Sequence, residues 1–415
     1  MFHDPVTTLE QLREHLSHPQ SNIAFLFGAG TSCAVQIPVD PAAAGDANVA
    51  TRSLIPNVIQ LTEVCKKEIE KLDAEGAVEK FKPALISMLA ELGGQEKANI
   101  EHLLSCVRRK IHALGEGDTL AGLTRADLEL VEETIQRTIA SQVNPPSSNF
   151  PESLPHVQLA RWASRIPREV PIEIFTTNYD ILLEMAFDSE RVPTFDGFVG
   201  CAKPFFLHES LSRPESMPAT GWSRLWKIHG SITWSIENVS GRPRVVRVAP
   251  HEGGEMILPS HHKYDESRKQ PYTALLDRLS RVMERENTVL IVCGYSFSDD
   301  HINAILFDAL QARRRPHIIA LQYTDPDMDS VLTSKAEALS NLMVLGPRVG
   351  IIGGKRGNWE LSNPARGALI EKHFVPDENT ADVADETNNS APPTGQLMLG
   401  DFTNFCRFLE SIAGA

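Results

Sequence analysis

The sequence lacks most features that mark secreted, membrane-spanning or zinc-stapled proteins. Its six cysteines are far apart and none forms a C-x-x-C pair, which excludes a zinc ribbon and argues against a disulfide framework. No apolar run approaches the ~18–20 residues that a membrane-spanning helix needs. The opening segment MFHDPVTTLEQLREHL has neither the basic nor the apolar part of a signal peptide. We therefore expect a cytoplasmic protein with no membrane contact.

Basic residues are also scarce relative to acids. The 415 residues include 40 Lys and Arg against 54 Asp and Glu, a net charge of −14. This balance argues against a protein that wraps nucleic acid, although a local cluster such as the three arginines at 313–315 could contact it or complement a helix dipole. The chain has no G-x-x-x-x-G-K-[ST] loop, so any ATPase activity would come from a partner.

Short continuous apolar runs alternate with helical patterns over most of the chain. Such runs are typical of strands that are covered by helices on both faces. Five runs predict strands: Ile23–Phe27, Ile172–Phe175, Leu225–Ile228, Val289–Val292 and Ile318–Leu321. Amphipathic patterns predict helices over 272–286 and 299–312. The alternation predicts an α/β fold, a Rossmann-like parallel sheet with helices on both faces.

Residues 40–165 show a different pattern, with several amphipathic helices and no convincing strand. We interpret this segment as a long all-helical insertion into a discontinuous domain formed by 1–39 and 166–365. The apolar faces of its helices must be buried, either in an intramolecular bundle or in a homo-oligomer. Residues 366–415 predict an acidic flexible arm that ends in a short apolar docking helix.

The first motif, FGAGTS at 27–32, directly follows the first predicted strand. Gly28 permits a tight turn, and Gly30 lets a backbone approach a phosphate closely. The N–H groups that follow favour an anion. Cys33 replaces the third glycine of a dinucleotide fingerprint, and no acidic strand end follows some twenty residues later, which disfavours a hydride-transferring dehydrogenase. A glycine-rich turn without a ligand is the alternative.

Two further polar turns follow the second and third predicted strands. Ligands of open α/β sheets bind at the carboxyl ends of the strands. In FTTNYD (175–180), Asn178 can orient a water and Asp180 can stabilise a developing positive charge. In KIHGS (227–231), His229 can act as a base near neutral pH. The alternatives are that Asn178 and Asp180 only cap the next helix and that His229 is structural.

The fourth turn, CGYSFSDDHIN at 293–303, precedes a predicted helix. Ser296, Ser298 and Asp299 can bind ribose hydroxyls or phosphate, or they can cap that helix. Each of the four turns is a weak signal alone. Four polar turns at separate strand ends are together hard to explain as local structure, and we expect them to share one ligand site.

The order and content of these motifs resemble the sirtuin family, particularly its bacterial antiphage-defence branch. The matching segments are GAGTS at 28–32, Ile37-Pro38, TTNYD at 176–180, IHGS at 228–231 and GYSFSDDHI at 294–302. The resemblance covers roughly 20–39 and 166–325. It implies NAD as the substrate.

The resemblance also implies roles for individual residues. Asn178 would place the attacking water, His229 would be the general base, and Asp180 would line the nicotinamide-ribose pocket. The remaining residues would bind NAD: Gly28, Ala29, Gly30 and Ser32 at the pyrophosphate, Thr177 beside Asn178, and Gly294, Ser296 and Asp300 around the adenosine ribose.

The sequence departs from protein-deacylating sirtuins at Gln36, which replaces the glycine before Ile37-Pro38, and at two further places. Their zinc module with two C-x-x-C pairs is absent, so we expect no zinc, and Val39-Asp40-Pro41 stands where they have Phe-Arg. These departures disfavour acyl-lysine recognition. The implied function is therefore hydrolysis of NAD⁺ to nicotinamide and ADP-ribose, which depletes NAD during phage infection.

The same resemblance implies a partner and leaves other functions open. A homo-oligomer and a HerA-type hexameric ATPase partner are expected, with control of activity in the insertion and the arm. One alternative is a non-catalytic subunit that binds NAD or ADP-ribose and regulates an ATPase or nuclease. Another is an NAD-dependent protein deacylase or ADP-ribosyltransferase.

Overall fold

The computed structural model describes residues 1–40, 50–73, 79–94, 98–115, 117–151, 153–239, 241–250, 271–312, 316–362, 368–377 and 392–413. The three arginines at 313–315 lie outside these ranges.

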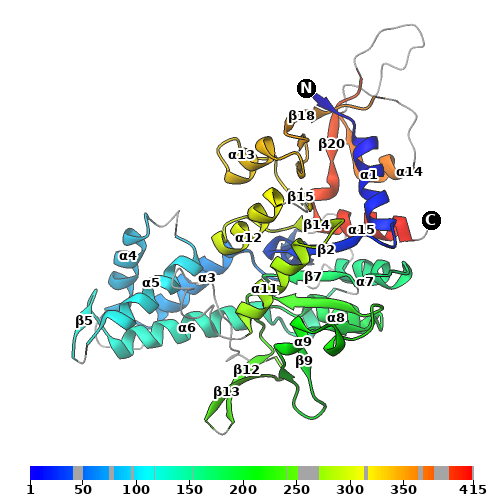
Figure 1. The fold of residues 1–415 in the computed structure, drawn as a ribbon. Coiled ribbons are helices and arrows are strands. Elements are labelled where there is room, and N and C mark those ends of the chain that lie inside the picture. Colours follow the sequence, from blue (N-terminus) through cyan, green and yellow to red (C-terminus); the bar gives the residue numbers. More distant parts are fainter. Residues whose placement is uncertain are drawn as a thin grey trace.

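Within the described ranges, a ten-stranded sheet forms the centre of the molecule (Figure 1). Its order is β1-β18-β17-β16-β15-β14-β2-β7-β11-β8, and all neighbours are parallel except β17, which is antiparallel to β16 and β18. The strands are β1 (Phe2–His3), β2 (Asn22–Phe27), β7 (Glu173–Thr176), β8 (Thr194–Phe195), β11 (Ser223–Lys227), β14 (Thr288–Cys293), β15 (His317–Leu321), β16 (Leu342–Leu345), β17 (Val349–Ile352) and β18 (Lys355–Trp359). The predicted α/β, Rossmann-like fold is confirmed.

Alternate side chains of the central strand β2 enter two different hydrophobic clusters. Ile23, Phe25 and Phe27 pack in a cluster that also contains side chains of α1 (Pro5–Ser17), α7 (Pro155–Arg165) and α15 (Phe402–Ala413). Ala24 and Leu26 face the other cluster, which includes α11 (Tyr272–Met283), α12 (Asp300–Gln311) and α13 (Val331–Ala338). Both faces of the strand are therefore buried from solvent, which explains its continuous apolar sequence.

All five predicted strands are present, but five strands of the sheet were not predicted. β1 and β8 have two residues each, too short for a periodic signal. β17 and β18 form a hairpin around Gly353 and Gly354, whose φ values of +59° and +78° suit a tight two-residue turn. Glycine pairs between strands are a known hairpin signal, so Gly353-Gly354 could have been used to predict this hairpin from the sequence.

Four of the described helices between residues 40 and 165 pack on one another: α3 (Val58–Lys71), α4 (Phe81–Glu91), α5 (Ile100–Ala113) and α6 (Arg125–Val143). Their apolar faces meet in one cluster within the chain, which Leu182 and Ile232 of the sheet domain join. This is the intramolecular bundle of the two alternatives above. The fifth helix, α7, packs on the sheet instead, so the end of the predicted insertion belongs structurally to the sheet domain. The insertion is not wholly helical, because short strands β4 (Thr51–Ser53), β5 (Thr119–Leu120) and β6 (Leu123–Thr124) lie within it.

A second, four-stranded antiparallel sheet was not predicted. Its order is β12-β13-β10-β9, with β9 (Phe198–Val199), β10 (Phe205–Phe206), β12 (Trp234–Val239) and β13 (Arg242–Arg247). Trp234 packs against the rings of Phe198 and Phe206, at centroid distances of 5.4 and 6.4 Å. Along the chain, β12 and β13 follow the turn that carries His229, whereas β9 and β10 precede it.

The C-terminal segment returns to the sheet domain. β19 (Phe374–Pro376) follows α14 (Ala368–His373) and pairs antiparallel with β20 (Gly395–Leu397). Two segments of the predicted arm thus lie side by side. The predicted docking helix is α15, and Phe402 and Phe405 contact Phe27 and Phe25 of β2. The apolar face of α15 is thus buried against its own chain. Residues 378–391 of the predicted arm lie outside the described residues.

None of the helices in the described ranges combines the length and the apolar character that crossing a membrane requires.

Candidate active site

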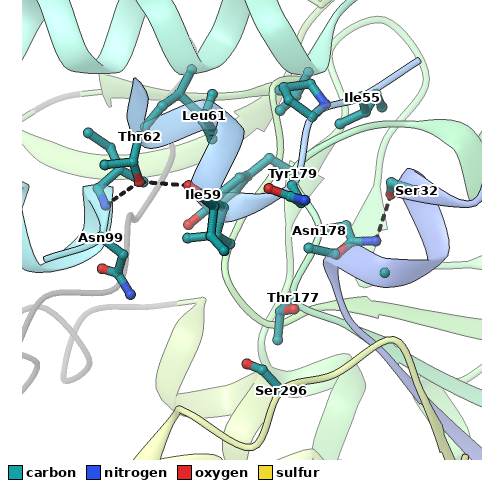
Figure 2. Close-up of a pocket in the computed structure, with 18 of the residues that line it drawn as sticks. Ser32, Ile55, Ile59, Leu61, Thr62, Asn99, Thr177, Asn178, Tyr179 and Ser296 are labelled. Atoms are coloured by element: carbon teal, nitrogen blue, oxygen red, sulfur yellow. Dashed lines mark hydrogen bonds between the residues drawn. The ribbon is translucent and has the colours of Figure 1, made fainter. Parts of the chain in front are cut away.

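A cavity of about 920 Å³ lies where the four motif turns meet. Figure 2 shows Ser32, Asn178 and Ser296, which come from three of these turns. The sheet side of the cavity comes from the residues after β2, β7, β11 and β14, the carboxyl ends of parallel strands. The predicted site residues that line it are Ala29, Gly30, Ser32, Thr177, Asn178, Asp180, His229, Gly294 and Ser296. Gly28 and Asp300 were also predicted but are not among the lining residues.

The three predicted glycines lie where two loops touch. The N–H of Gly30 donates to the backbone oxygen of Gly294 at 2.9 Å. A Cβ on Gly28 would lie 2.5 Å from that oxygen, and one on Gly30 would lie 2.6 Å from the Cα of Gly294. Gly294 itself has φ +66°. The structure therefore needs these glycines for loop packing, and their contact with a pyrophosphate stays a prediction.

Asn178 is held in one orientation by a chain of hydrogen bonds. Its amide nitrogen donates to the hydroxyl of Ser32 at 2.8 Å, and that hydroxyl donates to Asp180 Oδ2 at 2.6 Å. The same nitrogen also lies within hydrogen-bond distance of Gly28 O and Thr31 Oγ1. Three acceptors surround the nitrogen, so the Asn178 oxygen Oδ1 is the end that can accept a hydrogen bond from a water.

Asp180 also has a structural role. Its Oδ1 accepts the N–H of Leu182 at 3.0 Å, at the start of α8 (Leu182–Ser189). The buried ammonium of Lys227 donates to the backbone oxygen of Asp180 and lies 3.0 Å from Glu184 Oε1. Burial raises the pKa of the Glu184 carboxyl, and Lys227 opposes that rise. Asp180 is not the N-cap of α8, which is Ile181, but its carboxylate accepts the first N–H of that helix and also lines the cavity.

Lys227 and Glu184 were not identified from the sequence. The signal that was available is the lysine inside the apolar strand LWKI, because a buried lysine needs a partner.

His229 is paired with an acid that the sequence assigned to other roles. Its Nε2 lies 3.1 Å from Asp299 Oδ2, and both side chains are largely buried. Asp299 also caps α12, since its Oδ1 accepts the N–H groups of His301 and Ile302. Asp300, which was predicted to bind the adenosine ribose, is exposed as the first residue of α12. The preceding acid, Asp299, faces the cavity in its place.

The opposite side of the cavity is built by the insertion (Figure 2). Asn57 and Asn99 cap α3 and α5, and Thr62 accepts the N–H of Ile100 at 2.9 Å. Ile59 is 75% exposed although it lines the cavity, so its side chain offers apolar surface to a ligand. No motif marks this wall, because helix caps and apolar faces are common to all helices.

The cavity has the size of a small-molecule site. Its volume of about 920 Å³ is within the range of about 300–1,000 Å³ that is typical of such sites. The sheet side supplies hydroxyls, an amide and carboxylates for ribose and phosphate, and the insertion side supplies apolar surface for a ring. Among the described residues, the lining contains one lysine, Lys66, and no arginine. The Lys66 ammonium lies 2.7 Å from Glu63 Oε1.

Cys33 lies next to the cavity, at the end of α2 (Ala29–Cys33). Burial, with a smaller contribution from Asp180, raises the pKa of its thiol to about 11. The group stays protonated near neutral pH and is a poor nucleophile.

Within the described ranges, no three His, Cys, Asp or Glu side chains are grouped so that they could hold a metal ion. The expectation of a zinc-free site stays a prediction.

No curated protein matches the chain. Residues 172–342 match the family model described as SIR2-like domain, a span that begins at β7 and includes the motifs of Asn178, His229 and Asp299. A SIR2-like domain is consistent with an NAD-related activity. The match thus supports a sirtuin-like family for the part of the chain that carries three of the four motif turns.

Proposed function

We propose that this chain hydrolyses NAD⁺ at the bond between nicotinamide and ribose. The observation that carries the proposal is that Asn178, Asp180 and His229, from two separate strand ends, line one cavity of about 920 Å³. The SIR2-like match over 172–342 supports NAD as the ligand. The products would be nicotinamide and ADP-ribose.

The chemistry follows from the positions of these groups. Breaking the bond from C1′ to nicotinamide leaves the electron pair on the ring nitrogen and positive charge on the sugar. Asp180 would stabilise that charge, and Asn178 Oδ1 would orient a water toward C1′. As the water oxygen bonds to C1′, His229 would take its proton. A positioned base typically contributes about 10²- to 10⁴-fold.

Water is the acceptor in this proposal because of the second wall. Residues of α3 and α5 of the insertion form the wall of the cavity opposite the sheet loops. The sequence also lacks the two C-x-x-C pairs of protein-deacylating sirtuins. Both features favour a small-molecule substrate over an acyl-lysine of a protein.

The test is chromatography of NAD⁺ incubated with the purified protein, with and without extract of phage-infected cells. We expect nicotinamide release, and a loss of about 10²- to 10⁴-fold in Asn178→Ala and in His229→Ala. Asn341→Ala is the matched control, since Asn341 also bonds two backbone oxygens, those of Leu310 and Pro316, but does not line the cavity. Unchanged release in both site variants would reject the assignment.

The same assay separates the alternatives. Tight NAD binding without turnover under any of these conditions would favour the non-catalytic regulatory subunit. Product that forms only when an acyl-lysine peptide is present would favour the deacylase.

The biological setting is proposed from the resemblance. We propose a cytoplasmic effector that exhausts NAD during phage infection, as a homo-oligomer and with a HerA-type ATPase partner. Because α3–α6 and α15 bury their apolar faces within the chain, these faces no longer argue for an oligomer. The mass of the purified protein in solution, alone and with the ATPase, tests this part.

A further inference from the structure

We infer that Asp299 is a positioning residue for His229: it fixes the ring and selects the tautomer that can accept a proton inside the cavity. The inference rests on the proposed function. It concerns an acid for which the sequence suggested only ribose or phosphate binding or a helix cap.

The Asp299 carboxylate is itself held rigidly. The residue is 8% exposed, and its Oδ1 accepts the N–H groups of His301 at 2.9 Å and Ile302 at 3.3 Å. Its backbone oxygen accepts the N–H of Asn303 at 2.9 Å, the first turn of α12. One oxygen is thus committed to the helix, and the geometry of the helix start decides where the other oxygen points.

That other oxygen, Oδ2, lies 3.1 Å from His229 Nε2. A carboxylate only accepts hydrogen bonds, so the nitrogen that faces it must carry a proton. In the neutral ring the second nitrogen, Nδ1, is then the acceptor. Asp299 therefore leaves Nδ1 as the basic atom available to a water or a ribose hydroxyl, the arrangement by which an acid orients the histidine of a catalytic triad.

The substitution Asp299→Asn isolates this role because of how an amide bonds. The new side chain would have one oxygen, and the two N–H groups of His301 and Ile302 require it, which preserves the helix cap. The NH₂ group would then face His229 Nε2 and force it to be the acceptor. The proton would move to Nδ1, and the ring would present a donor where the reaction needs a base.

The experiment is Asp299→Asn, measured by the kcat and KM of nicotinamide release and by the ¹⁵N shifts of His229 in histidine-labelled protein. We expect kcat to fall by about 10²- to 10⁴-fold with a smaller change in KM, by analogy with the same substitution in catalytic triads. The ¹⁵N shifts are expected to change from the Nε2–H to the Nδ1–H tautomer, and His229→Gln identifies the signal.

Asp4→Asn is the matched control, because Asp4 also caps a helix, α1, and lies outside the cavity lining. It should leave kcat and the His229 signal unchanged. The double variant Asp299→Asn/His229→Ala should be no slower than His229→Ala alone, since Asp299 acts through the ring.

Two results would overturn the inference: wild-type kcat in Asp299→Asn, or an unchanged His229 tautomer. If the wild-type protein releases no nicotinamide, the proposed function fails separately. In that case the ¹⁵N shifts still test whether Asp299 sets the tautomer of His229. The dissociation constants of NAD from the wild type and from Asp299→Asn then test whether this pair affects binding at the site. Equal dissociation constants with an unchanged tautomer would end the case for Asp299.

Discussion

The two ends of strand β7 carry buried polar clusters of opposite character. At the amino end, Glu173 is 1% exposed and accepts hydrogen bonds from the Trp226 indole at 2.6 Å and from the guanidinium groups of Arg278 and Arg285. At the carboxyl end, Asn178 and Asp180 line the cavity. The two clusters begin only a few residues apart along one strand, and both would look polar and functional in the sequence.

The difference is in what completes each cluster. Glu173 is satisfied by side chains of its own chain, which come from β11, α11 and the residues that follow α11. It does not line the cavity, so no ligand can reach it there. A buried charge that the protein itself neutralises is structural, whereas polar groups that face an open volume are available to a ligand. Three predictions test this distinction.

The largest expected effect is on stability, at the amino end. Glu173→Gln leaves two guanidinium groups without their buried counter-charge, and the free energy of unfolding should fall by about 3–5 kcal/mol. NAD turnover per folded molecule should not change. Urea denaturation and activity normalised to folded protein measure the two quantities.

Glu237→Gln is the control for this substitution, because the Glu237 pair with Lys203 is partly exposed. Its effect should stay below about 1 kcal/mol. If Glu173→Gln lost turnover and kept its stability, the two ends of β7 would not differ as described.

The second prediction compares two histidines. His229 is paired and faces the cavity, whereas His373 at the end of α14 is 1% exposed and has no hydrogen-bond partner on either ring nitrogen among the described residues. Burial lowers the pKa of His373 to about 4. The unfolded chain binds this proton near pH 6.5, so stability is lost as pH falls from about 6.5 to 4.

His373→Leu should remove about 1–3 kcal/mol of this pH dependence, measured by denaturation between pH 7 and pH 4. His208→Leu, at an exposed histidine, should leave the pH dependence as it is. His156 is also buried with a pKa lowered to about 4, so part of the dependence should persist. An identical pH profile in His373→Leu and wild type would contradict this account.

The smallest expected effect concerns Cys33, beside the cavity. Its thiol pKa of about 11 keeps it protonated at pH 8. Cys33→Ala should leave turnover within about twofold, and a thiol reagent should react first at the exposed Cys201. Cys201→Ala should remove that fast reaction. Fast labelling of Cys33 with loss of turnover would instead make this residue part of the site.

Much of the site could be predicted because its signals are local. Strands buried on both faces must be continuously apolar, and turns at their ends must contain glycine or small polar residues. The parallel arrangement then brings the ends of β2, β7, β11 and β14 to one edge. On these grounds Asn178, Asp180 and His229 were expected at one site, and the structure has all three in one cavity.

The rest of the site had no such local signal. Lys227 and Glu184 approach each other only through the packing of β11 against α8, and Asp299 was indistinguishable from Asp300 until the start of α12 decided which side chain faces inward. The small sheet of β9, β10, β12 and β13 escaped prediction because two of its strands have two residues each.

The sequence alone thus determined the layered α/β fold and the motif turns, because backbone conformation and burial leave a periodic pattern in the chain. Only the tertiary structure decided which helix faces form the second wall of the cavity and which carboxylate meets His229. Those contacts join segments such as α3 and β7 that are more than a hundred residues apart in the chain. A local sequence pattern does not predict which distant segments come into contact.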